Sequence, residues 1–88
     1  MSYNLDISEK LDKILSKLST KNRKQLEIIN KKTKQILKNP YHFKPLSGDQ
    51  HGERRVHIDK HFVVTYEIDE DNKIIRLLDF EHHDNIYK

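Results

Sequence analysis

The sequence predicts a small α+β domain in which a helical hairpin packs on one face of a mainly antiparallel four-stranded sheet. Apolar residues recur at helical spacing through much of the first half of the chain, and they alternate with polar residues at its start and in its second half. The chain has 88 residues and no internal repeat or change of composition that would mark a second domain. We therefore expect one domain over residues 1–88, with the element order β-α-α-β-β-β and one thin core.

The first strand and the first helix come from the start of the chain. Tyr3, Leu5 and Ile7 alternate with polar residues, as in a half-buried strand. Ser8 then offers a cap for a helix that extends to Leu18. The apolar face of that helix consists of Leu11, Ile14, Leu15 and Leu18.

A second helix follows a short turn and ends before a proline. Ser19 and Thr20 are the residues expected to cap its start, and Asn39-Pro40 ends it. Its apolar stripe consists of Leu26, Ile29, Thr33, Ile36 and Leu37. Because both helices are amphipathic and the connection is short, we expect them to form an antiparallel hairpin.

Three strands are predicted after a loop that contains Pro45 and two glycines. They cover residues 53–58, 61–69 and 73–80. In the first of these strands, Val56 and Ile58 are expected to face the helices, whereas Arg55 and His57 point to the opposite, open face of the sheet. The third strand is apolar on both faces, which favours a central position in the sheet.

The composition limits the kinds of function that the chain can have. It contains no cysteine, which excludes disulfides, thiolate zinc sites and a cysteine nucleophile. No stretch reaches the roughly 18 to 20 apolar residues of a membrane span, and the N-terminus lacks the apolar core of a signal peptide. We therefore expect a cytoplasmic protein with no membrane partner. With 35% charged and 34% hydrophobic residues, the chain also fits a protein that a partner stabilises.

The second helix is strongly basic, because its lysines and one arginine are balanced only by Glu27. A solvated helix face and a surface that contacts phosphate groups explain this pattern equally well. The formal net charge of +3 adds weak support for a nucleic-acid partner.

The three later strands carry polar side chains that suit chemistry on RNA. The candidates are Arg55, His57, His61, Arg76, His82, His83 and Tyr87. RNA cleavage without a metal needs a base for the ribose 2′-OH, a cation for the phosphate charge and an acid for the leaving 5′ oxygen. Histidine titrates near neutral pH and arginine matches the shape of a phosphate. An obvious pair of carboxylates for glycoside chemistry is not expected on this face.

Metal binding is the competing use of the histidines. His57 and His61 are four residues apart, but on strands rather than on the helix of a zinc motif. A metal site would also need His82 or His83 and a carboxylate such as Asp79. We therefore expect no metal and no cofactor.

The two adjacent histidines leave one question open. Along an unbroken strand, Arg76 shares a face with His82, and Asp79 shares a face with His83. A bulge or a strand end near Glu81 would reverse this assignment.

The element order, the phrase PLSGDQHGERRVHIDKHFVVTYEID and the ending HHDNIY resemble the RelE/ParE superfamily of type II toxin-antitoxin toxins. The nearest likeness is to the YafQ and YoeB branch. The resemblance implies a RelE-like fold and an mRNA endoribonuclease that cuts in the ribosomal A site by attack of the 2′-OH, without a metal or cofactor. It also implies as partners the ribosome, the mRNA and a RelB-like antitoxin, which would form a hetero-oligomeric complex with the toxin.

The strand residues match the family's first motif. The pattern G-x-x-R, followed by a strand with V-x-Y, is matched by Gly52, Arg55, Val64 and Tyr66. The phrase RRVHI places His57 where YafQ-like toxins have a catalytic histidine. His61 stands near the position of an acidic catalytic residue of that branch, so its role stays open.

The end of the chain matches a second motif. Arg76 corresponds to an arginine that stabilises the phosphate, and His82 or His83 to the general acid. Tyr87 resembles a tyrosine that stacks on or orients the substrate. The residues expected to bind RNA, mainly by docking on the ribosome, are Lys31, Lys34, Lys38, Lys44 and Arg54.

Two other functions stay open at this point. The first is a non-catalytic inhibitor on the same scaffold, like the ParE toxins that poison DNA gyrase. The second is a nucleic-acid-binding module whose binding would survive the loss of His57 and His83. The histidines favour the ribonuclease, because gyrase-directed relatives lack that acid-base set.

Overall fold

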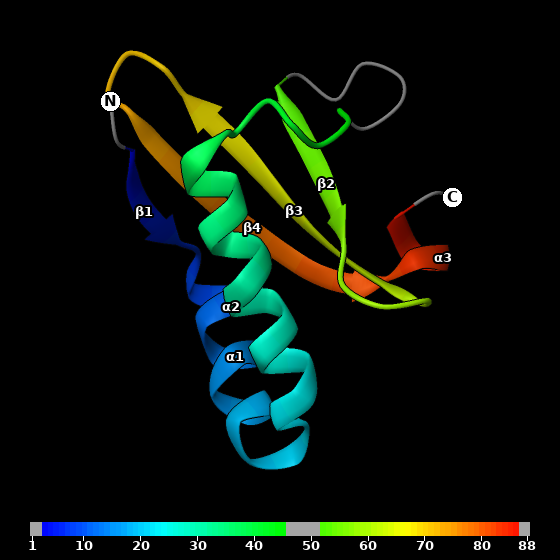
Figure 1. Cartoon of the computed structure of the whole chain (residues 1–88). Coiled ribbons are helices and arrows are strands. Elements are labelled where there is room, and N and C mark those ends of the chain that lie inside the picture. The colour runs from blue at the N-terminus through cyan, green and yellow to red at the C-terminus, as the bar shows by residue number, and fades with distance from the viewer. Residues whose placement is uncertain (1–2, 46–51, 87–88) are drawn as a thin grey trace.

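The computed structural model describes residues 3–45 and 52–86. A short strand is followed by two helices, three strands and a final turn of helix (Figure 1). The elements are β1 (Asn4–Ile7), α1 (Glu9–Lys21), α2 (Arg23–Lys38), β2 (Glu53–His57), β3 (Phe62–Asp69), β4 (Ile74–His82) and α3 (His83–Ile86). The α+β class and the predicted order of strands and helices are confirmed. Only α3 is an addition, since its residues were expected to continue the last strand or its tail.

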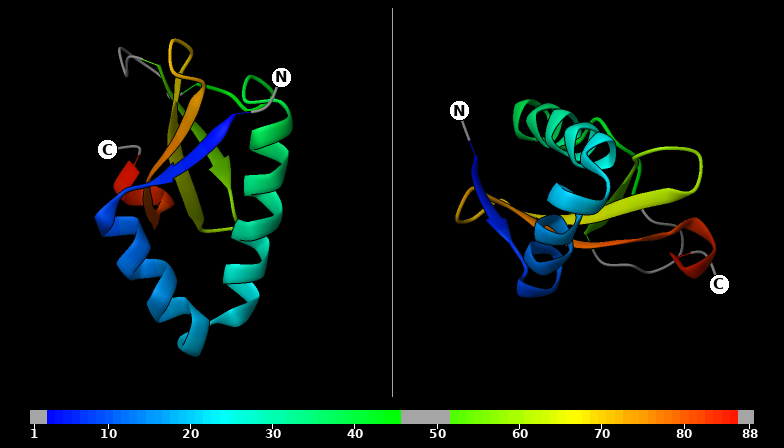
Figure 2. Two further views of the ribbon diagram at one scale, coloured as in Figure 1. Left: turned by 90° about the vertical axis from the view of Figure 1, so that its left-hand side faces the viewer. Right: turned by 90° about the horizontal axis from the view of Figure 1, so that it is seen from below.

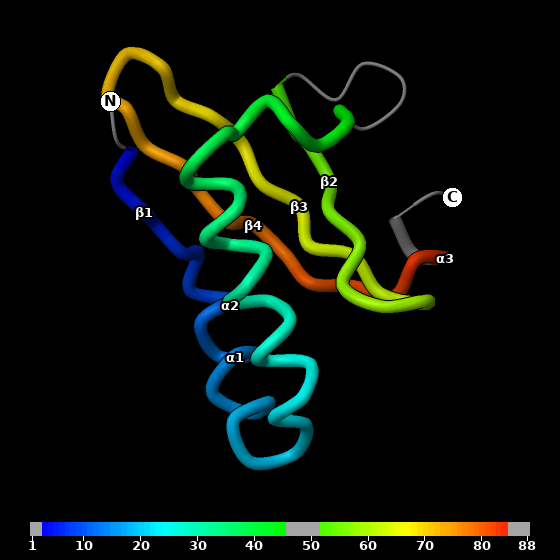
Figure 3. Tube along the Cα trace, viewed as in Figure 1, coloured from blue at the N-terminus to red at the C-terminus, as the bar shows by residue number. Residues whose placement is uncertain are grey.

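The strands form one mixed sheet in the order β1-β4-β3-β2. β1 runs parallel to β4, while β4 with β3 and β3 with β2 are antiparallel. The Cα trace shows β1 beside β4, although most of the chain lies between them in sequence (Figure 3). The predicted central position of β4 is therefore confirmed.

The hydrophobic core lies between the helical hairpin and one face of the sheet, and Figure 2 shows α2 and α3 on opposite sides of the strands. Leu11 of α1 and Ile29 and Ile36 of α2 are buried in this core. The strands contribute Val56, Val64, Tyr66, Ile75 and Leu77, and Ile58 joins the core directly after β2. Because burial of one such aliphatic side chain stabilises a fold by about 1.5–3 kcal/mol, these contacts hold the hairpin on the sheet.

The turn between the helices differs from the prediction. Ser19 and Thr20 lie inside α1, where their hydroxyls donate to carbonyls one turn earlier. Asn22 separates the helices instead: its amide donates to the carbonyl of Leu18, and its side-chain oxygen accepts from the amide of Gln25. One residue thus ends α1 and caps α2.

β4 contains a bulge of one residue. Thr65 of β3 pairs with Asp79, but the next residue, Tyr66, pairs with Leu77, which leaves Leu78 as the extra residue. The start of α1 is bound at the same place. Ser8, the predicted cap of α1, donates from its amide to the carbonyl of Leu77 (3.0 Å) and from its hydroxyl to the carbonyl of Leu78 (2.7 Å).

The bulge changes which residues of β4 face the helices. Leu77 before it and Phe80 after it both pack toward the core, although their sequence separation is odd. A one-residue shift has this effect because side chains alternate along a strand. Asp79 and Glu81 therefore share the open face with Arg76.

Tyr66 and Arg54 tie the sheet to the loop that follows α2. The Tyr66 ring is fully buried, and its hydroxyl donates to the carbonyl of Pro40 at 2.6 Å. Burial raises the pKa of Tyr66 to about 12. Nη1 of Arg54 donates to the carbonyl of Phe43 at 2.7 Å, and its guanidinium lies 5.0 Å from the centre of the Tyr41 ring.

Glu70, in the β3–β4 turn, joins the start of the chain to the same loop. It accepts hydrogen bonds from Lys73 (2.6 Å), Tyr3 (2.9 Å) and Tyr41. These bonds, with that from Lys73 the strongest, lower the pKa of Glu70 to about 2. Three segments distant in sequence thus meet at one carboxylate.

Replacing Tyr66 with Phe removes the hydroxyl and leaves the Pro40 carbonyl without this donor in a buried setting. We expect the free energy of unfolding to fall by about 1–2 kcal/mol. Urea denaturation followed by circular dichroism measures the change. An unchanged unfolding midpoint would contradict the contribution of the Tyr66 hydroxyl to stability.

Glu70 should make the fold sensitive to acid. Because its pKa is about 2 in the folded chain and near 4.5 when unfolded, its contribution is complete above about pH 4.5 and is lost as the pH falls toward 2. Glu70→Gln should flatten the fall in the urea midpoint over this range. An equally steep fall in the variant would show that other carboxylates are responsible.

Candidate active site on the open face of the sheet

The face of the sheet opposite the helices has an apolar centre and a polar surround. Val63 and Thr65 of β3 are only 0% and 4% exposed, although neither belongs to the core under the helices. Their cross-strand neighbours are Arg55 and His57 on β2 and Asp79 and Glu81 on β4. Polar groups from two strands therefore flank a buried centre on β3.

His57 and His83 meet on this face. His57 is the last residue of β2 and His83 the first residue of α3, and their ring centroids lie 5.7 Å apart with planes at 28°. The His83 side chain is 43% exposed, and the side chain of His57 is exposed as well. The amide of His83 donates to the carbonyl of His61 at 2.6 Å, which fixes the start of α3.

His82 lies on the other side of the strand. It pairs with Phe62, whose ring it meets edge-on at 5.4 Å, and it stacks on His61 at 5.8 Å. The expectation for an unbroken strand, in which Arg76 shares a face with His82, is wrong because of the bulge at Leu78. The bulge lies at Leu78 rather than near Glu81, so Arg76 shares its face with His83, and Asp79 shares that face as well, as expected.

The pKa of His57 lies below its ordinary value. Although the residue is exposed, loss of water around part of the ring is the largest cause, and the positive charges of Arg55, His83 and Lys32 add to it. At neutral pH the His57 ring is therefore mainly unprotonated and can accept a proton. A proton on His83 disfavours one on His57, so the two rings suit opposite roles in a proton transfer.

Arg55 adds a guanidinium to this face. It precedes His57 by two residues on β2, so the two side chains project to the same side. Its Nη1 donates to the carbonyl of Pro45 at 2.7 Å, and its amide donates to the carbonyl of Lys44 at 3.1 Å. The loop after α2 thus holds the edge strand that carries both Arg55 and His57.

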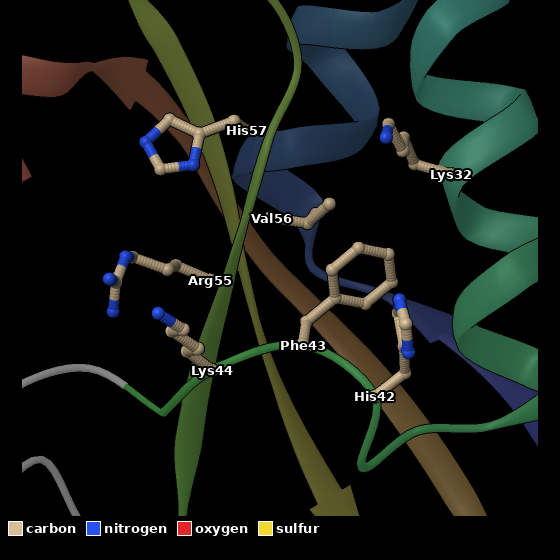
Figure 4. A pocket seen from close by; sticks show the side chains of 7 residues that line it. All are labelled: Lys32, His42, Phe43, Lys44, Arg55, Val56 and His57. Atoms are coloured by element: carbon tan, nitrogen blue, oxygen red, sulfur yellow. The ribbon is translucent and has the colours of Figure 1, made fainter.

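A groove of about 370 Å³ lies at the outer edge of β2 (Figure 4). Its lining residues are Lys32, His42, Phe43, Lys44, Arg55, Val56 and His57. In Figure 4, Arg55 and His57 project to one side of β2, while Lys32 extends from α2 on the other side, with Phe43 between them. The Lys32 Nζ is 5.8 Å from the centre of the Phe43 ring. No carboxylate belongs to this described lining, so the groove is cationic.

Arg76 is not brought to the histidine pair. Its Nε donates to Asp6 and its Nη1 to Glu67, each at 3.1 Å, and the two carboxylates raise its pKa. It also precedes His82 by six residues on β4, which is roughly 20 Å along a strand. A contact between Arg76 and phosphate therefore stays a prediction from the family resemblance.

The open face also carries carboxylates that the sequence analysis did not place there. Asp79 and Glu81 lie on β4, and both bind Lys10 of α1, at 3.0 and 3.5 Å. The expectation that this face lacks an acidic pair is wrong, because the bulge brings both residues to it. Lys10 compensates their charge along the part of β4 that extends beyond its pairing with β1.

The residues predicted to bind RNA fall into two groups. Lys31, Lys34 and Lys38 are exposed along α2, and Lys44 is exposed beside the groove. Arg54 is separate from them, because its contacts hold the loop after α2 on the helix side of the sheet. The structure thus leaves four of the five predicted lysine and arginine side chains on the surface, and it gives Arg54 a structural position.

Two features are absent from the described residues, and one predicted site residue lies outside them. Within residues 3–45 and 52–86, no group of three or more His, Asp and Glu side chains is placed to hold a metal ion. Over the same ranges, no helix is long and apolar enough to cross a membrane. Tyr87 lies outside the described residues, so its role stays a prediction.

Asp59 is not among the predicted site residues, although it helps to position them. One oxygen of its carboxylate accepts from the amides of His61 (2.9 Å) and Phe62 (3.1 Å), and the other accepts from Gln25 of α2 (2.9 Å). Asp59 therefore shapes the turn between β2 and β3. In this turn the carbonyl of His61 accepts the hydrogen bond from the amide of His83 at the start of α3. An aspartate that bonds to amides two and three residues later is typical of such turns, so the local sequence did contain this signal.

Comparisons with known proteins agree with this fold. Residues 4–87 match the family model described as "ParE toxin of type II toxin-antitoxin system, parDE". The "Putative toxin RelE4" of Methanocaldococcus jannaschii is 49% identical over 86 residues, which cover 98% of this chain and 92% of the relative.

Two solved structures show the same architecture at low sequence identity. The YoeB/ParE toxin from Agrobacterium tumefaciens has a TM-score of 0.82 at 15% identity and covers 91% of this chain and 98% of its own. One chain of the E. coli DinJ-YafQ toxin-antitoxin complex has a TM-score of 0.75 at 19% identity, with 100% of both chains covered.

The position of Arg55 beside His57 can be tested by titration. Arg55→Gln removes one of the charges that lower the pKa of His57, so that pKa should rise. The Hε1 resonance of His57, followed by NMR against pH, measures it. Arg54→Gln is the matched control, since it removes the same charge from the adjacent residue and should leave His57 unchanged. Equal effects of the two substitutions would contradict the geometry of this face.

Proposed function

The chain belongs to the RelE/ParE superfamily of toxins from type II toxin-antitoxin systems, and from this premise we propose that it is a ribosome-dependent mRNA endoribonuclease. The observation that carries the proposal is the pair of His57 and His83 beside Arg55 on the open face. An acid, a base and a cation for phosphate are the groups that RNA cleavage without a metal requires.

His57 is the proposed general base. Its lowered pKa keeps the ring unprotonated at neutral pH, so it can take the proton of the ribose 2′-OH. The 2′ oxygen then bonds to the adjacent phosphorus. The negative charge that grows on the phosphate oxygens is stabilised by the Arg55 guanidinium.

His83 is the proposed general acid. As the P–O5′ bond breaks, protonated His83 gives its proton to the leaving 5′ oxygen, which produces a 2′,3′-cyclic phosphate and a free 5′-OH. The lowered pKa of His57, to which the positive charge of His83 contributes, is what assigns the base to His57 and leaves His83 as the acid in this proposal. His82 takes no part in this scheme, because it faces His61 and Phe62.

The exposed lysines of α2 are proposed to dock the protein on ribosomal RNA. Lys31, Lys34 and Lys38 lie on one element, and none of the three is buried in the core. Binding that depends on neutralising phosphate charge weakens steeply with added salt. The same surface explains why an isolated mRNA would be a poorer substrate than one held in the ribosomal A site.

An antitoxin is the partner that the family implies for this chain. Among the structural neighbours, the DinJ-YafQ structure from E. coli and the YoeB-YefM structure from Staphylococcus aureus are toxin-antitoxin complexes. We propose that a RelB-like antitoxin forms a hetero-oligomeric complex with this chain and covers or distorts the face that carries His57 and His83.

A gyrase inhibitor is the second candidate, and the match to the ParE family model favours it. On this alternative the scaffold binds a protein target and the histidines have no catalytic role. The two candidates differ in their targets. A ribonuclease leaves cut mRNA, whereas a gyrase inhibitor leaves mRNA intact and stops DNA supercoiling.

Expression of the chain in bacteria should arrest translation and leave mRNAs cut at codons in the A site. His57→Ala and His83→Ala should each lower the cleavage rate by about 10²- to 10⁴-fold, as is usual for a lost acid or base. Primer extension on mRNA and single-turnover cleavage on purified ribosomes measure both effects.

The adjacent histidine provides the control for this experiment. His82→Ala makes the same change one residue earlier, on the other side of the strand, and should retain cleavage. Full toxicity in both the His57 and the His83 variant would refute the assigned site. Intact mRNA together with inhibited DNA supercoiling would refute the ribonuclease function and support the gyrase inhibitor.

A further inference from the structure

The cationic groove at the edge of β2 contains residues that the proposed cleavage does not use. Lys32 and His42 are not needed for the acid, the base or the cation, and Lys44 stands on the opposite side of β2 from α2. Five of the seven side chains that line the groove are basic or imidazole groups, which predicts an anionic ligand.

We propose that this groove binds a phosphodiester group of the RNA strand next to the one that is cut. The proposal rests on the ribonuclease function and adds to it contacts with the neighbouring RNA backbone on both sides of β2: Lys44, beside Arg55, on the open side, and Lys32 on the α2 side. The groove's volume of about 370 Å³ lies within the 300–1,000 Å³ typical of ligand sites, so it admits a phosphate together with its sugar.

The groove is continuous with the proposed cleavage site. Arg55 and His57 line the groove, and the His57 ring also stacks on His83 at 5.7 Å. An RNA strand that places one phosphate at His57 and His83 therefore needs to pass only the edge of β2 to place a neighbouring phosphate near Lys32. The exposed lysines of α2 continue the positive surface beyond that point.

The lysine on α2 is held in place for such a contact. Its Nζ lies 5.8 Å from the centre of the Phe43 ring, and Phe43 stands between Lys32 and β2. A cation held over an aromatic ring loses less conformational freedom when it meets a phosphate than a fully flexible lysine would. Phe43 and Val56 supply the apolar part of the same wall.

A ligand in the groove should also change the pKa of His57, the proposed general base. The charges of Lys32 and Arg55 lower the pKa of His57 in the free protein. A bound phosphate compensates these charges, so it should raise the pKa of His57 and make the ring a stronger base when RNA is present. The substrate would then help to activate the base that removes the proton of its own attacking 2′-OH.

The test uses the isolated full-length chain and two probes, inorganic phosphate and the all-deoxy trinucleotide d(ApApA), which lacks the attacking 2′-OH. NMR should show that each probe raises the pKa of His57 and shifts the resonances of Lys32 and Lys44. Lys32→Gln and Lys44→Gln should each weaken trinucleotide binding at least threefold. Each should also reduce the slope of log K against log salt by about 0.7, the value for one phosphate contact with a single strand.

Lys17→Gln on α1 is the matched control, since it removes one exposed positive charge away from the groove and should change neither quantity. Equal affinity of the Lys32 variant and the unchanged protein would overturn the proposal. Tighter binding of a glutamate hexapeptide than of the trinucleotide would also overturn it, in favour of an acidic protein segment. The binding test involves neither ribosomes nor cleavage. If the chain binds the trinucleotide as expected but does not cut mRNA on ribosomes, the ribonuclease function is refuted and the phosphate site is retained.

Discussion

The one-residue bulge in β4 determines the layout of the whole site. Without it, Asp79 would face the helices and Phe80 would face solvent, so the core and the open face would both be incomplete. The bulge is fixed by Ser8, which binds the carbonyls of Leu77 and Leu78 from the start of α1. The connection that begins the helical hairpin thus also decides which C-terminal histidine meets β2.

Charge is distributed unequally across the open face. On the β4 side, Asp79 and Glu81 are compensated by Lys10, and Arg76 is compensated by its own carboxylate partners. On the β2 side, the groove contains cations and, among its described lining residues, no carboxylate. A polyanion is therefore favoured along β2 and disfavoured along β4, which gives an RNA strand a preferred path.

Much of this could be predicted from the sequence, because alternation along the strands is strong. It placed Val56 in the core and Arg55 and His57 on the opposite face, and the two-sided apolar character of β4 placed that strand in the centre. The bulge could not be predicted in the same way. Leu77 and Leu78 are both apolar, so no change of polarity marks the position where the alternation shifts.

The other errors have similar causes. Ser19, Thr20 and Asn22 all have side chains suited to a helix cap, and only the packing of the two helices selects Asn22. Lys32 looks like any other lysine of a basic helix, because its neighbour Phe43 comes from a different segment. Contacts between segments distant in sequence thus carry the information that local patterns lack.

The parallel pairing of β1 with β4 has a consequence for the lifetime of the site. Asn4 pairs with Ile74, so forming this pairing closes a very long loop and costs conformational entropy. The strand β1 itself has only four residues, and three of them are exposed. A short, exposed edge strand opens at lower free energy than the core does. Because Ser8 directly follows β1, detachment of β1 would weaken the hydrogen bonds of Ser8 to the carbonyls of Leu77 and Leu78 at the bulge. Local opening of β1, which costs less free energy than global unfolding, is therefore expected to disturb the bulge on which the position of the histidine pair depends.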